Sequence, residues 1–148
     1  MPTAKVGRAI VLYGIGVEGK SDYPRFGTGL DEYSLDQQSI TGNCWRFNRM
    51  QESVTAIIGT RQYFLFDVEP GHYVYSGFNG ARLRDSGKVP AFEVPAGRIV
   101  YLGDFIYSDD GKVDIRRDLN RVRSYFKEDV LLAESLLVPP PRLFLCMP

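Results

Sequence analysis

Apolar and polar residues alternate along most of the chain, as in strands that bury one face. The run AIVLYGIGV at residues 9–17 is apolar and β-branched, and alternating runs follow at 44–50, 53–59 and 61–68. Each run is short and is closed by turn-forming residues. YSDDGKVDI at 107–115 carries an Asp-Gly pair and predicts a further turn between strands. The pattern therefore predicts a mainly β protein.

Two segments depart from this alternation. Residues 18–43 are rich in Gly, Asp, Ser and Tyr and have no period, so we expect a long loop there. From Asp118, a suitable N-cap, the apolar residues take helical spacing. They are Leu119, Val122, Phe126, Val130, Ala133 and Leu137. This spacing predicts one C-terminal helix over about 118–137, which VPPPR ends, and an apolar tail at 138–148.

An internal repeat covers residues 66–77 and 92–103. Both copies read F-x-V-x-x-G-x-x-V-Y-x-G, with a separation of 26 positions. Each copy predicts a strand, a tight turn at a glycine and a second strand that runs back beside the first. Two unrelated hairpins with similar turns would give the same pattern. In either case the repeat predicts much of an antiparallel sheet.

Length and charge narrow the class of protein. The chain has 148 residues, which suits a single domain over 1–148. Its 18 basic side chains balance 18 acidic ones, so we expect no nucleic-acid partner. No apolar stretch approaches the roughly 20 residues that a transmembrane helix needs. The first residues lack the body of a signal peptide, so we expect either that the protein stays in the cytoplasm or that a leader has been removed.

The segment GIGVEGKS at residues 14–21 fits the phosphate-binding pattern G-x-x-x-x-G-K-[ST]. Such a loop needs a helix directly after it, because the helix N-terminus supplies N–H groups to the phosphate. Pro24, Gly27 and Gly29 follow instead, without helical spacing, so we interpret the motif as a chance match. Nucleotide binding, the alternative interpretation, would use Gly14, Gly19, Lys20, Ser21 and Asp67.

Asp67 imitates the magnesium-binding aspartate that ends a strand in phosphate-loop enzymes. That strand is normally parallel to its neighbours and buried on both faces. Asp67 instead comes three residues before the Pro-Gly turn of the first repeat copy, and Glu93 fills the same slot in the second copy. Both acids therefore fit the outward positions of alternating strands.

Four tyrosines of the repeat region are candidates for a binding surface. They are Tyr73, Tyr75, Tyr101 and Tyr107. If exposed in a row they would form an aromatic binding face; the alternative is that they pack between sheets.

The two cysteines and the single histidine have no metal-binding spacing. Cys44 and Cys146 could form one disulfide that ties the C-terminal tail to the body, or could remain two buried thiols. His72, beside a predicted turn, is interpreted as a strand residue. We expect no metal site, no catalytic residues and no cofactor.

At the repeat, the sequence resembles small bacterial β-sandwich domains of the transthyretin or carboxypeptidase-regulatory type. The matching residues are 66–73 and 92–105. Many members of this loose group are envelope proteins or lipoproteins, so the resemblance implies export, although the lipid-bearing N-terminal cysteine of lipoproteins is missing here. The expected fold is an antiparallel β-sandwich of about seven to eight strands with one C-terminal helix.

The expected function is that of a non-catalytic binding or structural domain, acting at the bacterial cell envelope. Its partner would be another protein or an envelope component. Two alternatives remain open at this stage: a nucleotide-binding protein that uses residues 14–21, and a partner-binding inhibitor or toxin-like protein.

Overall fold

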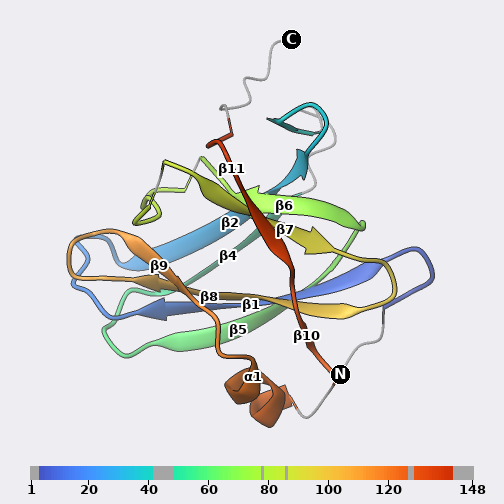
Figure 1. Cartoon of the computed structure of the whole chain (residues 1–148). Helices are drawn as coiled ribbons and strands as arrows, with labels where there is room; N and C mark the ends of the chain where they lie inside the picture. The colour runs from blue at the N-terminus through green and yellow to red at the C-terminus, as the bar shows by residue number, and fades with distance from the viewer. Residues whose placement is uncertain (1–3, 42–48, 78, 86, 127–128, 142–148) are drawn as a thin grey trace.

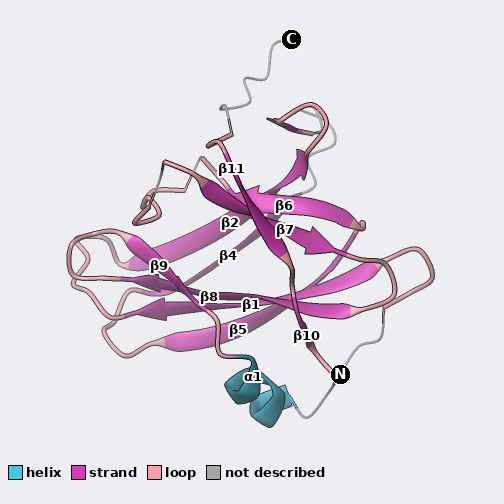
Figure 2. Ribbon diagram, in the orientation of Figure 1, coloured by secondary structure: helices cyan, strands magenta, loops and turns pink. Residues whose placement is uncertain are grey.

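The computed structural model describes residues 4–41, 49–77, 79–85, 87–126 and 129–141. This part of the chain is mainly β, as predicted, with one short helix (Figure 2). It holds eleven strands, more than the seven to eight expected. In chain order the elements are β1 (Ala9–Val17), β2 (Arg25–Ser34), β3 (Ser39–Ile40), β4 (Arg49–Thr55), β5 (Arg61–Val68), β6 (Gly71–Tyr75), β7 (Val89–Val94), β8 (Ile99–Tyr107), β9 (Val113–Arg116), α1 (Leu119–Phe126), β10 (Leu131–Leu132) and β11 (Ser135–Val138).

The strands form two sheets that lie over one another, with α1 outside the lower one in Figure 1. Sheet A has the order β10-β8-β1-β5, with β9 also paired to β8. Sheet B has the order β11-β7-β6-β2-β3, with β4 also paired to β2. β1 is buried along its whole length. Sheet B covers one of its faces, and α1 with its neighbours covers part of the other.

Aromatic side chains from both sheets fill the space between them. Phe105 of β8 lies edge-on to Tyr13 of β1 at 5.6 Å between ring centroids and stacks against Tyr75 of β6 at 5.8 Å. The buried hydroxyl of Tyr13 donates across the gap to the carbonyl oxygen of Thr28 in β2, at 3.0 Å. Because a buried hydroxyl needs a partner, this bond fixes the facing sheets relative to each other.

The repeat forms two connections between the sheets, so the prediction of two hairpins is wrong. In the first copy β5 belongs to sheet A and β6 to sheet B; in the second copy β7 belongs to sheet B and β8 to sheet A. The prediction of strand, glycine turn and strand is correct, and Gly97 of the second turn has the positive φ of 76°. The strands on either side of each turn bond to other strands instead of to each other.

The expectation of a purely antiparallel fold is wrong at the centre of sheet A. β1 pairs antiparallel with β5 but parallel with β8, and β10 also pairs parallel with β8. The repeat explains the first parallel pair. Its two connections bring β5 and β8 into one sheet in opposite directions, and β1 lies between them. A strand in that position must run parallel to one of its neighbours.

Residues 18–43 do not form one loop, because β2 is a strand of ten residues there. Its partners β4 and β6 come from later in the chain and supply its hydrogen bonds on both sides. Gly29 is held further by the Asn79 side chain, which accepts from its N–H at 2.7 Å and donates to its oxygen at 2.8 Å. Local pattern could not reveal a strand whose pairing is supplied by distant segments.

The predicted helix over 118–137 is correct only in its first half. Asp118 caps it as expected, with its carboxylate accepting from the N–H of Arg121 at 3.1 Å. After α1, the apolar residues of 131–138 serve β10 and β11, because the open edges of β8 and β7 offer backbone partners. Of the predicted tail 138–148, residues 142–148 lie outside the described residues. In the described part of the chain, no helix has the length and apolarity to cross a membrane.

Candidate functional site

The segment 131–138, which we call the strap, runs from the edge of sheet A to the edge of sheet B. On the side of sheet A, the N–H of Ala133 donates to the carbonyl oxygen of Tyr101 in β8 at 3.0 Å. One residue later the carbonyl oxygen of Glu134 accepts from the N–H of Glu93 in β7 at 2.7 Å. The strap therefore closes this side of the two-sheet core, as its position across the sheets in Figure 1 shows.

The side chain of Arg117 bonds the strap to sheet A. Its Nε donates to the carbonyl oxygen of Leu102 in β8 at 3.0 Å, and its Nη2 donates to that of Ala133. The guanidinium also lies 5.5 Å from the ring centroid of Phe92 in β7, close enough for a cation–π contact. Desolvation by burial lowers the pKa of Arg117 from its usual value. Arg117 thus links β8, β7 and the strap.

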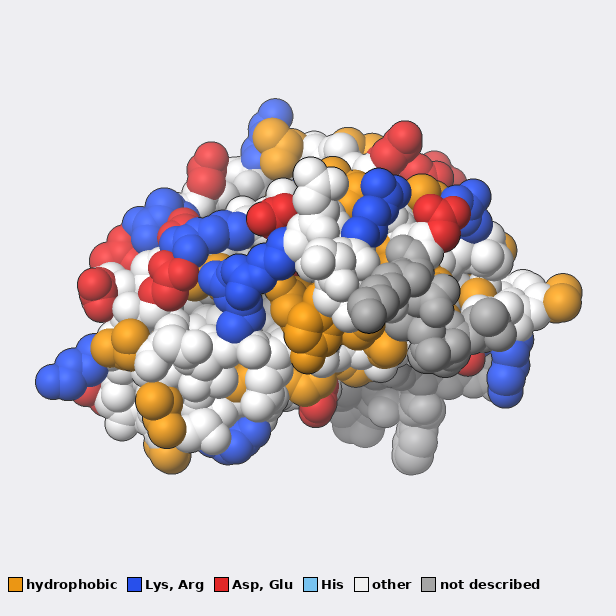
Figure 3. Space-filling model, turned by 90° about the horizontal axis from the view of Figure 1, so that it is seen from below, with side chains coloured by type: hydrophobic (Ala, Val, Ile, Leu, Met, Phe, Trp, Pro, Cys, Tyr) orange, Lys and Arg blue, Asp and Glu red, His pale blue; other side chains and the backbone are white. Residues whose placement is uncertain are grey.

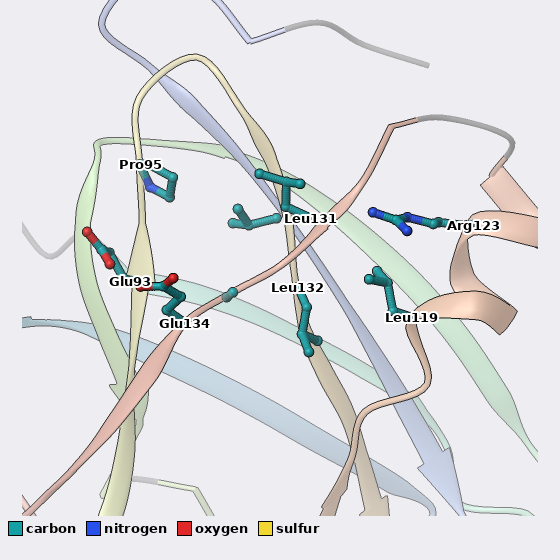
Figure 4. Close-up of a pocket in the computed structure, with 9 residues that line it drawn as sticks. Glu93, Pro95, Leu119, Arg123, Leu131, Leu132 and Glu134 are labelled. Atoms are coloured by element: carbon teal, nitrogen blue, oxygen red, sulfur yellow. The ribbon is translucent and has the colours of Figure 1, made fainter.

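A hollow of about 470 Å³ lies beside the strap and α1 (Figure 4). Glu93 and Glu134 lie together at one end of it, while Arg123 comes from α1 at the other end. Apolar side chains lie between these charges. The residues that line the hollow are Glu93, Pro95, Val100, Leu119, Arg123, Leu131, Leu132, Ala133 and Glu134.

The charges of the hollow are only partly matched by the residues that the structure describes. Among the described residues, Glu93 and Glu134 have no ion pair. The N–H of Glu93 in β7 bonds to the carbonyl oxygen of Glu134, directly before β11, so the two acids lie opposite each other and their like charges repel. Arg123 donates its Nε to the carbonyl oxygen of Val130 at 2.9 Å. The hollow therefore presents an acidic end, an apolar middle and a basic end, which suits an extended amphipathic segment.

The glycines of GIGVEGKS make room for neighbouring residues. A Cβ on Gly14 would lie 2.5 Å from a carboxylate oxygen of Asp104, and one on Gly16 would lie 2.6 Å from the Cδ1 of Ile106. A Cβ on Gly19 would lie 2.2 Å from the carbonyl carbon of Ser108. Gly14 and Gly16 are inside β1, so they are not part of a loop.

The remaining residues of the nucleotide-binding alternative are not brought together. No helix follows Ser21, as predicted; its Oγ accepts from the N–H of Tyr23 at 3.1 Å, and β2 begins at Arg25. Asp67 is paired in register with Ile10, near the start of β1, whereas Lys20 follows the end of that strand. At about 3.3 Å per residue, the length of β1 separates them by about 20 Å or more. Asp67 instead forms an ion pair with Arg8, at 2.8 Å.

The four tyrosines do not form an exposed row. Tyr73 and Tyr75 are buried in the core between the sheets, and Tyr101 is buried on the outer side of sheet A under α1. Tyr107 is half-buried and packs against Phe26, at 5.2 Å between ring centroids. The alternative, packing between the sheets, is therefore correct for Tyr73 and Tyr75 but not for Tyr101. Tyr107 and Ser21 line a second hollow of about 450 Å³ at one end of the sheets.

Sequence reasoning missed Asp104, a carboxylate whose side chain is only 2% exposed. Tyr101 and Tyr63 donate their hydroxyls to it at 2.7 and 3.1 Å, and the guanidinium of Arg61 lies 3.7 Å away. Burial beside this carboxylate raises the pKa of both tyrosines, so they remain donors. The alternation of Gly14 and Gly16 in β1 was the available signal, since glycines on one face of a strand mark a close approach.

The structure does not test the disulfide prediction, because Cys44 and Cys146 lie outside the described residues. Within the residues that are described, no group of three or more His, Cys, Asp or Glu side chains could hold a metal ion.

Comparison of the chain with protein-family models, with curated proteins and with solved structures finds no match. The resemblance at residues 66–73 and 92–105 therefore remains a prediction.

Proposed function

We propose that this protein is a non-catalytic binding domain of the bacterial cell envelope, with a transthyretin-type β-sandwich as its scaffold and the hollow beside the strap as its binding site. One observation carries the proposal: apolar side chains in the hollow lie between two carboxylates and a guanidinium. The resemblance of the two repeat copies to envelope proteins supports the location.

The occupant that fits this lining is an extended segment of a partner protein, with a lysine or arginine beside apolar residues. A cationic group at Glu93 and Glu134 would relieve the repulsion between the two carboxylates. Leu131 and Leu132 would cover the apolar side chains of the same segment. Charge complementarity at both ends would fix the direction of the segment, since Arg123 favours an acidic group.

The binding step can be tested with two labelled peptides of eight residues. One contains leucines and two lysines, and the other has the lysines replaced by glutamates. We expect the lysine peptide to bind more tightly, and the double substitution Glu93→Gln/Glu134→Gln to weaken it by about tenfold or more, as measured by fluorescence anisotropy. Glu52→Gln, on the exposed surface of β4, is the matched control. Equal binding of both peptides, or no binding, would reject the site.

The location can be tested separately with the complete reading frame of the gene. A tagged protein expressed from it should be recovered in the envelope fraction, and an upstream leader that ends in a cysteine would explain the anchoring. Recovery in the cytoplasmic fraction alone would reject the envelope but leave the binding site open.

A further inference from the structure

Among the described strands β11 ends sheet B, and two of its residues direct their backbone groups away from the sheet. In an antiparallel pair, the N–H and C=O groups of alternate residues point to the same neighbour. The bond from Glu93 to Glu134 shows that Glu134, Leu136 and Val138 point toward β7. The N–H and C=O groups of Ser135 and Leu137 therefore point away from it. Within the described part of the chain, no residue bonds to these four groups.

The same edge is apolar. Leu136 is 48% exposed and Leu137 is 65% exposed, and the sequence SLLV of β11 contains no charge. Edge strands of monomeric proteins usually carry charged residues or prolines that prevent pairing with another chain. Proline begins only at Pro139, directly after the strand. β11 therefore has the features of a strand that pairs.

We propose that a second copy of this chain pairs antiparallel with β11 and joins two copies of sheet B across a two-fold axis. In the register that we infer, Ser135 lies opposite Leu137 of the partner subunit, and Leu136 lies opposite Leu136 of the partner subunit. All four free backbone groups of each strand then form hydrogen bonds. This interface goes beyond the proposed function and does not depend on it, because the backbone groups that pair belong to Ser135 and Leu137, neither of which lines the hollow.

The faces of the sheet select this register. Side chains alternate along a strand, so residues that lie opposite each other in a continuous sheet must point to the same face. Leu136 can therefore face Leu136 of the partner subunit, but cannot face Leu137 of the partner subunit. A register centred on Leu137 would place Ser135 opposite Pro139 of the partner subunit, which has no N–H, and would leave the carbonyl oxygen of Ser135 without a donor.

Charge also favours a second copy over an unrelated segment. In the inferred register Glu134 lies opposite Val138 of the partner subunit, so no like charges meet. The chain has 18 basic and 18 acidic side chains, so its copies have no net charge to repel each other. The edge is also self-complementary, since the donors and acceptors of one β11 match those of another after a two-fold rotation.

Cysteine cross-linking tests the register. In a variant that lacks the native cysteines (Cys44→Ser/Cys146→Ser), Leu136→Cys places two thiols on residues whose Cα atoms are about 4.5 Å apart, within the range for a disulfide. We expect mild oxidation to give a covalent dimer. Leu137→Cys is the matched control: it is more exposed, but its two copies would be offset diagonally, too far apart to bond. Equal cross-linking of both variants, or none, overturns the register.

Mass measurements test the dimer itself. Light scattering after size-exclusion chromatography should give twice the chain mass for the wild type. Leu137→Pro removes only an N–H that points away from β7, so the monomer should stay folded while dimerisation weakens by at least about tenfold. Leu136→Glu, which sets two carboxylates at the axis, should give a monomer with an unchanged circular dichroism spectrum. A monomeric wild type at every concentration, or dimeric variants, would overturn the proposal.

Discussion

The two copies of the repeat share a sequence pattern, but they bury their equivalent tyrosines in different places: one between the two sheets and the other on the outer face of sheet A. Tyr75 of the first copy points from sheet B into the space between the sheets, where it stacks on Phe105. Tyr101 of the second copy points out of sheet A toward α1 and donates its hydroxyl to Asp104. Both side chains are nevertheless buried.

This difference shows that alternation predicts a strand without predicting which face is the core. Sheet A is covered on its inner face by sheet B and on part of its outer face by α1, so an outward tyrosine in β8 is still removed from water. Gly14 leaves space beside that tyrosine for the carboxylate of Asp104. Tyr75 of the first copy packs in the core between the sheets, and its hydroxyl donates to the carbonyl oxygen of Ala81.

The largest expected effect comes from filling the space beside Tyr101. Gly14→Ala would place a methyl group 2.5 Å from Asp104, and we expect it to lower the free energy of unfolding by about 3 kcal/mol. Urea denaturation measures the change. Gly80→Ala is the control, since a Cβ there has no heavy atom within 4 Å and should change stability by less than about 0.5 kcal/mol. Equal effects would mean that the outer face of sheet A is not tightly packed.

Removing the two tyrosine hydroxyls tests the contrast directly. Tyr101→Phe takes a donor from a buried carboxylate and should cost about 2 kcal/mol. Tyr75→Phe takes a donor from the neutral carbonyl of Ala81 and should cost about 1 kcal/mol. Both values come from urea denaturation at pH 7. A larger cost at Tyr75 would contradict the assignment of the charged partner to the second copy.

A smaller effect on stability is expected at the hairpin of β8 and β9. There the guanidinium of Arg84 donates to the carboxylates of Asp110 and Asp114. This guanidinium lowers the pKa of both carboxyls, so it stabilises the fold above their ordinary values near pH 4. That stabilisation is lost as the pH falls through the lowered values. We expect the Tm difference between wild type and Arg84→Gln to be constant above about pH 5 and to shrink toward pH 2.

The control for this pH dependence is Arg25→Gln. Arg25 bonds to the hydroxyl and carbonyl oxygens of Ser53, neither of which titrates. Its effect on Tm should therefore stay the same across the acid range. If the effect of Arg84→Gln on Tm were also the same at every pH, Arg84 would not stabilise the ionised carboxylates of Asp110 and Asp114.

The smallest expected effect is at Lys20, which lies next to the glycines that serve packing. Lys20→Ala should leave Tm unchanged to within about 1 °C, with or without Mg-ATP or Mg-GTP, because no phosphate-binding loop is formed at residues 14–21. Thermal-shift measurements check this. A ligand-dependent rise of Tm in the wild type that disappears in Lys20→Ala would restore the nucleotide-binding alternative.

Signals that act within a few residues predicted their structures correctly. The turn around Gly111, which has φ 77°, joins β8 to β9 as Asp-Gly indicated, and Asp118 starts the helix. The hollow beside the strap was not predicted, because it is built from β7, α1 and the strap, which are distant in the chain or were assigned to the wrong element. None of its nine lining residues was predicted to bind a partner: Glu93 was interpreted as an outward acid, and Leu119 and Ala133 as apolar positions of the predicted helix.

The sequence by itself determined that the chain is mainly β, where its central strands and turns lie, and that Asp67 and Glu93 face outward. Only the tertiary structure decided which strands pair, that β1 enters between β5 and β8, and that 131–138 becomes a strap. The physical reason is that alternation and turn chemistry are properties of neighbouring residues, whereas a strand obtains its hydrogen bonds and its burial from segments far along the chain.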